Sequence, residues 1–126
     1  MIIEDLREIA VSLDLDLFVL FGSQVKNSAK DNSDYDLAFF KKNCSVEDEI
    51  KIIDVLEDFF KDKKFDLINL EKDVSPVLKK DIFYEGVCVF EKNKGFFQKE
   101  KERAYFDYVD YFTLLKPTID KYLTNG

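Results

Sequence analysis

The chain has 126 residues, of which 36% are charged and 46% hydrophobic, and its formal net charge is −7. This length suits one domain with its own core, and this composition is typical of a globular protein rather than a disordered or membrane chain. The sequence has no histidine and only two cysteines, which excludes histidine-based acid–base chemistry and a Cys/His zinc site.

The acidic charge argues against nucleic acid as a partner, because phosphate backbones are bound mainly by Lys and Arg. A local group of lysines, Lys26, Lys30, Lys41 and Lys42, could still hold a nucleotide triphosphate. The N-terminus lacks the basic and apolar regions of a signal peptide, and no long apolar span follows, so we expect a cytoplasmic protein with no membrane partner.

The first two elements are an amphipathic helix and a buried strand. Ile2, Leu6 and Ala10 recur at helical spacing with charged residues between them. The run from Leu17 to Phe21 is too short for a helix and rich in aromatic and branched residues, which predicts a strand buried on both faces.

Gly22 and Ser23 end this strand. A glycine lets the backbone come close to a ligand, and a serine after a strand can open a helix whose free N–H groups bind an anion. The pair therefore predicts a phosphate site, and Lys26 in the following loop is a further candidate phosphate contact.

Asp34 and Asp36 flank Tyr35 at the start of a second apolar run. Residues two apart on a strand share a face, so both carboxylates should point the same way while Tyr35 points into packing. Two adjacent ionised carboxylates repel each other, so their joint ionisation is unfavourable unless a cation lies between them. Mg²⁺ suits this position because it prefers hard oxygen ligands. Asp66, inside the apolar run from Phe65 to Leu70, would complete a three-carboxylate site for one or two ions if its strand lies beside the Asp34–Asp36 strand.

Two serines predict the helices of the second half. Ser45, with Asp48 three residues on, predicts a capped helix, and Ser75 followed by Pro76 predicts another that Gly86 ends before a strand from Val87 to Phe90. The expected buried residues of the first helix are Ile50, Ile53, Leu56, Phe59 and Phe60, and those of the second are Val77, Leu78, Ile82 and Phe83.

A long helix is expected from Phe96 to Tyr122, which Pro117 should kink or end. One interpretation is that this helix covers the sheet. Its aromatic residues exceed one stripe, however, and Tyr105, Phe106 or Phe112 is expected to meet a protein partner or a second copy of the chain.

The order of elements predicts an α/β fold with a mixed sheet backed by helices, in a single domain of residues 1–126 with a core of 1–91 and a C-terminal helical extension of 96–122.

The spacing of these motifs carries a family resemblance. Gly22-Ser23, then ten residues, then Asp34-Tyr35-Asp36, with Asp66 on a following strand, resembles the polymerase beta-like nucleotidyltransferase superfamily. The small size resembles its minimal nucleotidyltransferase (MNT) branch, the antitoxin partners of HEPN-domain ribonuclease toxins in type VII toxin–antitoxin systems. The resemblance extends from Ile2 to Glu91; where the family often has a basic residue followed by glycine, this chain has Lys26 followed by Asn27.

The resemblance implies a protein adenylyltransferase that uses Mg²⁺, or Mn²⁺, to transfer AMP from ATP to a tyrosine of a HEPN toxin and so neutralise it. Its catalytic and metal-binding residues would be Asp34, Asp36 and Asp66, and its nucleotide-binding residues Gly22, Ser23 and Lys26. Two alternatives stay open: an antitoxin that acts by binding alone, and transfer to a small molecule or an RNA end. The C-terminal helix would join homo- or hetero-oligomers.

Overall fold

A four-stranded mixed sheet forms the centre of the protein. The structure is a computed structural model that describes residues 2–22, 25, 34–72 and 74–124. The sheet order is β3-β2-β1-β4, with β1 at Leu17–Phe21, β2 at Tyr35–Phe40, β3 at Phe65–Asn69 and β4 at Val87–Glu91. β1 pairs antiparallel with β2 and with β4, whereas β2 and β3 are parallel. The predicted α/β fold with a mixed sheet is confirmed.

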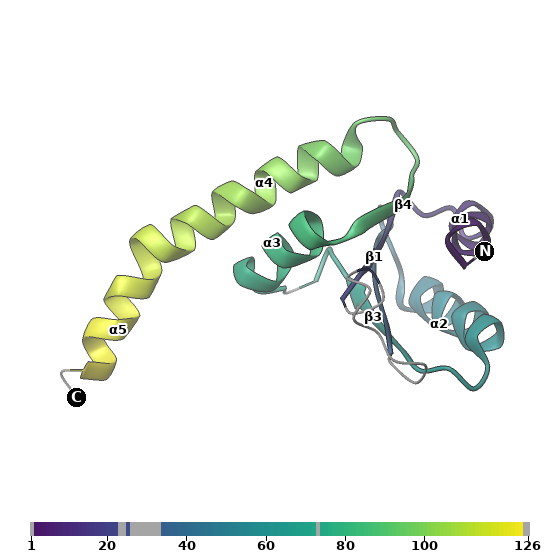
Figure 1. The fold of residues 1–126 in the computed structure, drawn as a ribbon, viewed down its shortest axis with the longest axis horizontal. Helices are drawn as coiled ribbons and strands as arrows, with labels where there is room; N and C mark the ends of the chain where they lie inside the picture. Colours follow the sequence, from purple (N-terminus) through teal and green to yellow (C-terminus); the bar gives the residue numbers. More distant parts are fainter. Residues whose placement is uncertain (1, 23–24, 26–33, 73, 125–126) are drawn as a thin grey trace.

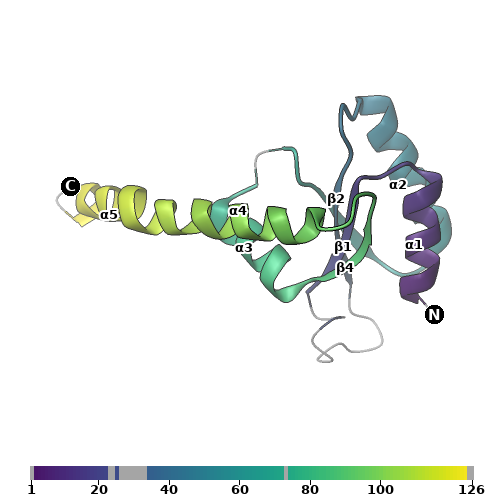
Figure 2. The same cartoon turned by 90° about the horizontal axis from the view of Figure 1, so that it is seen from above.

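Helices cover both faces of this sheet (Figures 1 and 2). α1 (Ile2–Ser12) and α2 (Val46–Phe60) lie on one face, and α3 (Pro76–Glu85) and the start of α4 (Phe96–Asp110) lie on the other. Because side chains alternate along a strand, each strand contributes to both cores. Phe18 packs toward α1 and α2, while Val19 packs toward α3.

Serine caps fix where α2 and α3 begin, as the sequence predicts. The backbone N–H of Asp48 donates to Ser45 Oγ at 3.0 Å, and the N–H of Ser45 donates to Asp48 Oδ2 at 3.0 Å. The N–H of Leu78 donates to Ser75 Oγ at 3.2 Å, with Pro76 in the first turn. The first cap starts α2 shortly after β2 ends, so that α2 can cross over and return the chain as a parallel β3.

The predicted buried faces of α2 and α3 are wrong in part. α2 buries Ile52, Leu56 and Phe60, whereas Ile50 and Ile53 are 54% and 38% exposed. Apolar residues occupy more than one stripe of α2, so periodicity alone allows either face to be chosen. On α3, likewise, Ile82 and Phe83 are buried but Val77 and Leu78 are exposed.

The C-terminal helix covers the sheet only at its start, which corrects the interpretation that it lies across the sheet. α4 continues through a π-helical segment, η1 (Tyr111–Leu115), into α5 (Lys116–Thr124), and this arm projects away from the body (Figures 1 and 2). Of the arm's described side chains, Ala104 alone is fully buried. None of the described helices is both long and apolar enough to span a membrane.

Pro117 neither ends the helix nor begins it, since it lies inside α5. The irregularity precedes it: in η1 the backbone N–H of Lys116 donates to Tyr111 O, five residues back. A proline ring would clash with the carbonyl four residues earlier, that of Thr113, in regular α-geometry. The wider π-turn is a known way to accommodate such a disruption without breaking the helix.

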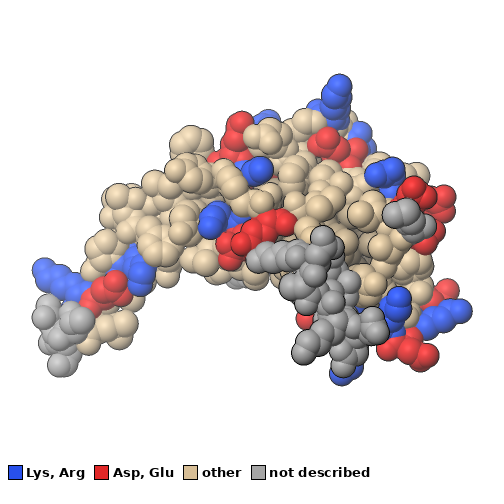
Figure 3. Space-filling view, viewed as in Figure 1, with Lys and Arg blue, Asp and Glu red and all other residues tan. Residues whose placement is uncertain are grey.

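Large apolar side chains remain exposed along this arm. Tyr105, Phe106 and Phe112 are 46%, 65% and 39% exposed, and Leu114, Leu115, Ile119, Tyr122 and Leu123 are more than a third exposed as well. Figure 3 shows a broad stretch of the arm without charged side chains. The arm therefore offers an apolar surface that the rest of the described chain does not cover.

We expect Phe106→Ser/Phe112→Ser to leave cooperative unfolding intact and to lower the free energy of unfolding by no more than about 2 kcal/mol, because both rings are already exposed. The matched control is Phe83→Ser, whose ring is 1% exposed and should cost about 3–5 kcal/mol or more. Urea unfolding measures both. Loss of cooperative unfolding in the double variant would show that the arm's rings belong to the core.

Candidate functional site

Two of the predicted acids meet on adjacent strands. Parallel pairing of β2 with β3 places Asp36 opposite Asp66. Both lie on the α3 side of the sheet, because Ala38 and Ile68, two residues further along each strand, pack in the core under α3. The N–H of Tyr35 donates to Lys64 O at 3.0 Å and holds this register. The predicted neighbourhood of the two strands is confirmed.

Gly22 lies directly against Asp36. Phe21, the last residue of β1, pairs with Asp36, and Gly22 follows it with a φ of 81°. A Cβ on Gly22 would overlap Asp36 Oδ2 and lie 3.0 Å from Asp36 Cγ. Glycine is therefore required here twice, for its left-handed backbone and for the close approach of the carboxylate.

Asp34 precedes β2 by one residue and is exposed, whereas Asp36 is half-buried. Burial raises the pKa of Asp36 above its usual range, and the charges of Asp66 and then of Asp34 raise it further. The charges of Asp34 and Asp66 thus lie close enough to oppose the ionisation of Asp36.

A cation would relieve this repulsion. The candidate donors are all carboxylate oxygens, which is the donor chemistry that Mg²⁺ and Mn²⁺ prefer. Within the described ranges, however, no three acidic, histidine or cysteine side chains converge as one ready metal site. The donor chemistry of Asp34, Asp36 and Asp66 fits such an ion, while Ser23 and Lys26, the other predicted phosphate contacts, lie outside the described residues.

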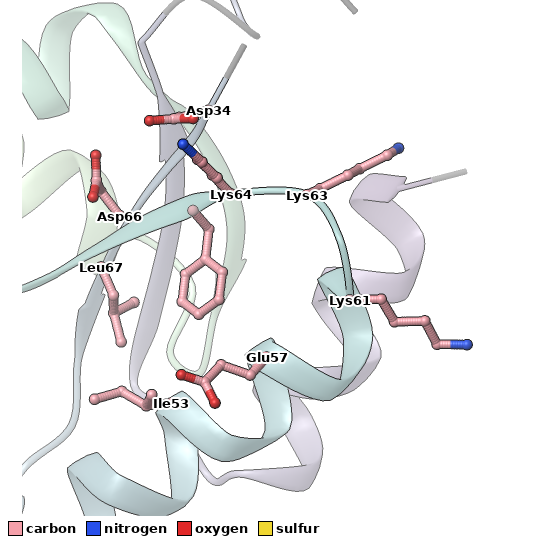
Figure 4. Close-up of a pocket in the computed structure, with 9 residues that line it drawn as sticks. Asp34, Ile53, Glu57, Lys61, Lys63, Lys64, Asp66 and Leu67 are labelled. Atoms are coloured by element: carbon pink, nitrogen blue, oxygen red, sulfur yellow. The ribbon is translucent and has the colours of Figure 1, made fainter. Parts of the chain in front are cut away.

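An open groove adjoins the acids along β3, with a volume of about 660 Å³. We call it the β3 groove; its lining residues are Asp34, Ile53, Glu57, Lys61, Lys63, Lys64, Phe65, Asp66 and Leu67. Figure 4 shows Asp34, Asp66 and Lys64 at one end, with Ile53 and Glu57 rising from α2 below. Sequence reasoning missed these lysines because it treated them only as the end of α2; their position just before the Asp66 strand was the available signal.

Comparison with known proteins agrees with this arrangement. The family model described as "Polymerase beta, Nucleotidyltransferase" matches residues 4–95. Comparison with curated proteins gives no match.

Several solved structures share the fold. A chain of a toxin–antitoxin crystal structure with AMP-PNP has a TM-score of 0.79 and 18% identity, covering 98% of this chain and 99% of that one. A chain of the tri-AMPylated Shewanella oneidensis HEPN toxin in complex with MNT antitoxin has a TM-score of 0.65 and 17% identity, covering 98% and 93%. A chain of the toxin–antitoxin MntA-HepT has a TM-score of 0.64 and 17% identity, covering 98% and 94%.

Gly22→Ala should destabilise the protein more than Gly95→Ala. Both glycines have positive φ, but nothing lies within 4 Å of a Cβ on Gly95, whereas one on Gly22 would overlap Asp36. Backbone strain should lower the free energy of unfolding of each variant by about 1 kcal/mol, and the overlap with Asp36 should lower that of Gly22→Ala by at least about 1 kcal/mol more. Denaturant unfolding gives the difference, and equal losses would show that the contact with Asp36 is easily relieved.

Asp36→Asn should raise, or at least not lower, the melting temperature at about pH 7 in EDTA. The raised pKa means that the fold favours protonated Asp36, so its stabilising contribution is complete below the unfolded value of 3.8 and disappears as the pH rises through the folded value. A neutral amide avoids that loss. The advantage over the parent should therefore shrink as the pH falls toward 3.8, as thermal melts over this range would record.

The exposed Asp5→Asn, on α1, is the control and should not reproduce the gain of Asp36→Asn near pH 7. A melting temperature of Asp36→Asn well below that of the parent near pH 7 would mean that the charged carboxylate stabilises the fold.

Proposed function

The chain belongs to the polymerase beta nucleotidyltransferase family, and from this premise we propose that it is an antitoxin that transfers AMP from ATP to a tyrosine of a HEPN-domain ribonuclease toxin. The observation that carries the proposal is the meeting of Gly22, Asp36 and Asp66 at one end of three neighbouring strands. A turn suited to phosphate thereby adjoins acids suited to a metal. The toxin–antitoxin complexes that share the fold support the choice of acceptor.

The acids have distinct roles in this proposal. Asp34 and Asp36 would hold a divalent ion, Mg²⁺ or Mn²⁺, and Asp66 would help to hold a second. When bound, such an ion neutralises charge on the triphosphate and its leaving group. Gly22 supplies a backbone free of side-chain atoms next to Asp36, so that the phosphates can approach. Ser23 and Lys26 are proposed as further phosphate contacts.

Transfer needs one bond made and one broken. The tyrosine Oη attacks the α-phosphorus of ATP, the bond from that phosphorus to the oxygen bridging to the β-phosphate breaks, and pyrophosphate leaves. Asp66 accepts the phenolic proton; it is exposed at the edge strand, where an incoming hydroxyl can reach it. The chain's part is to orient the two reactants and to move this proton.

The projecting arm is proposed as a binding surface for the toxin. Its apolar side chains, including Phe106 and Phe112, are exposed in the isolated chain, and they lie outside the core of residues 1–91. Burying such rings is worth about 1.5–3 kcal/mol each, which is enough for a few of them to support a complex. The division into a catalytic core and an extension of residues 96–122 is part of this proposal.

Incubation with ATP and Mg²⁺ should increase the intact mass of a HEPN-domain protein by one or more AMP units. Asp34→Asn and Asp36→Asn should each slow this transfer about a hundredfold or more, because each removes a charged ligand while keeping the side-chain shape. Asp5→Asn is the control and should keep the parent rate. Calorimetry should show ATP binding that is lost in EDTA and weakened in Ser23→Ala.

Two outcomes would contradict this proposal in different ways. A HEPN ribonuclease that is inhibited with no change in its mass would indicate an antitoxin that acts by binding alone. ATP binding of equal strength with and without a divalent ion would remove the argument from the three carboxylates.

A further inference from the structure

β3 has an open edge beside the proposed catalytic acids. β3 is the last strand in the order of the described sheet. The N–H of Tyr35 donates to Lys64 O, and the N–H of Leu70 donates to Phe39 O at 2.9 Å, so the even-numbered residues from 64 to 70 turn their backbone groups toward β2. Because these groups alternate along a strand, the N–H and C=O of Phe65 and Leu67 point the opposite way, into the β3 groove.

The groove beside this edge has an apolar floor, and three lysines and three acids line it. Leu67, Phe65 and the half-exposed Ile53 of α2 supply apolar surface. Lys61 and Lys64 are exposed, and neither forms an ion pair with a carboxylate of the described residues. Figure 4 shows Lys61 and Lys63 extending away from Asp34 and Asp66 into solvent. Lys61 and Lys64 are therefore available to pair with carboxylates of a ligand, although acids also line the groove.

The groove lies beside Asp66, on the side of the site away from the proposed phosphate contact. Gly22, the proposed phosphate contact, ends β1 on one side of Asp36, and Asp66 lies on the other side, on β3. A segment at the outer edge of β3 is therefore next to the proposed proton acceptor without crossing the phosphate turn. Its alternate side chains would project on the face that carries Asp66.

We propose that the β3 groove binds an extended, acidic segment of the acceptor protein, which pairs with β3 as an additional strand and presents its hydroxyl side chain to Asp66. This inference rests on the proposed function for the identity of the acceptor. The segment's backbone bonds to Phe65 and Leu67, its inward apolar side chains cover Leu67 and Ile53, and its carboxylates meet Lys61 and Lys64. The backbone provides affinity, and the lysines select for acidic sequence.

Residue-resolved amide exchange tests this pairing with a defined probe. The probe is a blocked hexapeptide of alternating glutamate and valine with one central tyrosine, titrated to millimolar concentration into the isotopically labelled chain. In the free protein the amides of Asp66 and Ile68 should exchange slowly because they face β2, and those of Phe65 and Leu67 should exchange fast. The peptide should slow Phe65 and Leu67 by about tenfold or more, and the same peptide with proline in place of one valine should not.

Charge-reversal variants test whether Lys61 and Lys64 themselves, rather than the overall charge of the chain, hold the peptide. Lys61→Glu/Lys64→Glu should weaken peptide binding about tenfold, because it replaces two positive charges by negative ones. The matched control, Lys94→Glu/Lys99→Glu, changes two exposed lysines, one in the turn after β4 and one in the first turn of α4, and should leave the peptide affinity within about twofold. Equal loss in both variants would overturn the role of Lys61 and Lys64.

The remaining outcomes decide between the docking site and the function on which it rests. No protection of Phe65 and Leu67 at saturating or millimolar peptide overturns the pairing. Protection that increases with protein concentration alone overturns it in favour of a second copy of the chain. AMP transfer to a HEPN protein without protection of these amides would support the proposed function and refute the docking site. Protection of these amides without any AMP transfer would support the docking site and refute the proposed function.

Discussion

The parallel alignment of β2 with β3 is the constraint on which the site depends. A parallel pair cannot be joined by a tight turn, so the chain between the strands must form α2 and cross the sheet. The capped start of α2 at Ser45 and the bond from Tyr35 to Lys64 fix both ends of that crossover. A slip of one residue would turn Asp66 to the α2 face and separate it from Asp36.

This arrangement concentrates the electrostatic cost of the fold at one place. No polar or charged side chain of the described residues is fully buried, and none of their buried side-chain nitrogen or oxygen atoms lacks a hydrogen-bond partner. Half-buried Asp36 nevertheless has a raised pKa, first because of its partial burial and then because Asp66 and Asp34 lie near it. Because Asp36 is only partly buried, solvent and cations can still reach the carboxylates. An acid with a purely structural role in the core would not need such access.

The sequence predicted those features that depend on local chemistry and on spacing. Strand runs, both serine caps and the meeting of Asp36 with Asp66 could be predicted because each follows from a short pattern. The buried face of α2 could not, since Ile50 and Ile52 both fit helical periodicity and only tertiary packing chooses between them. The direction of the arm could not be predicted for the same reason: periodicity shows that a helix has an apolar face, but not what covers it.

The described residues form only part of the two-substrate site that the proposed reaction requires. Three strand ends supply Gly22, Asp36 and Asp66, yet beyond Asp66 the described sheet has no further strand to enclose an acceptor. A small acceptor would need walls that the open β3 groove does not provide, because little of its surface would be buried there. The proposed protein acceptor would not need such walls, because it could contact the groove and the exposed arm at once and so combine two weak binding surfaces.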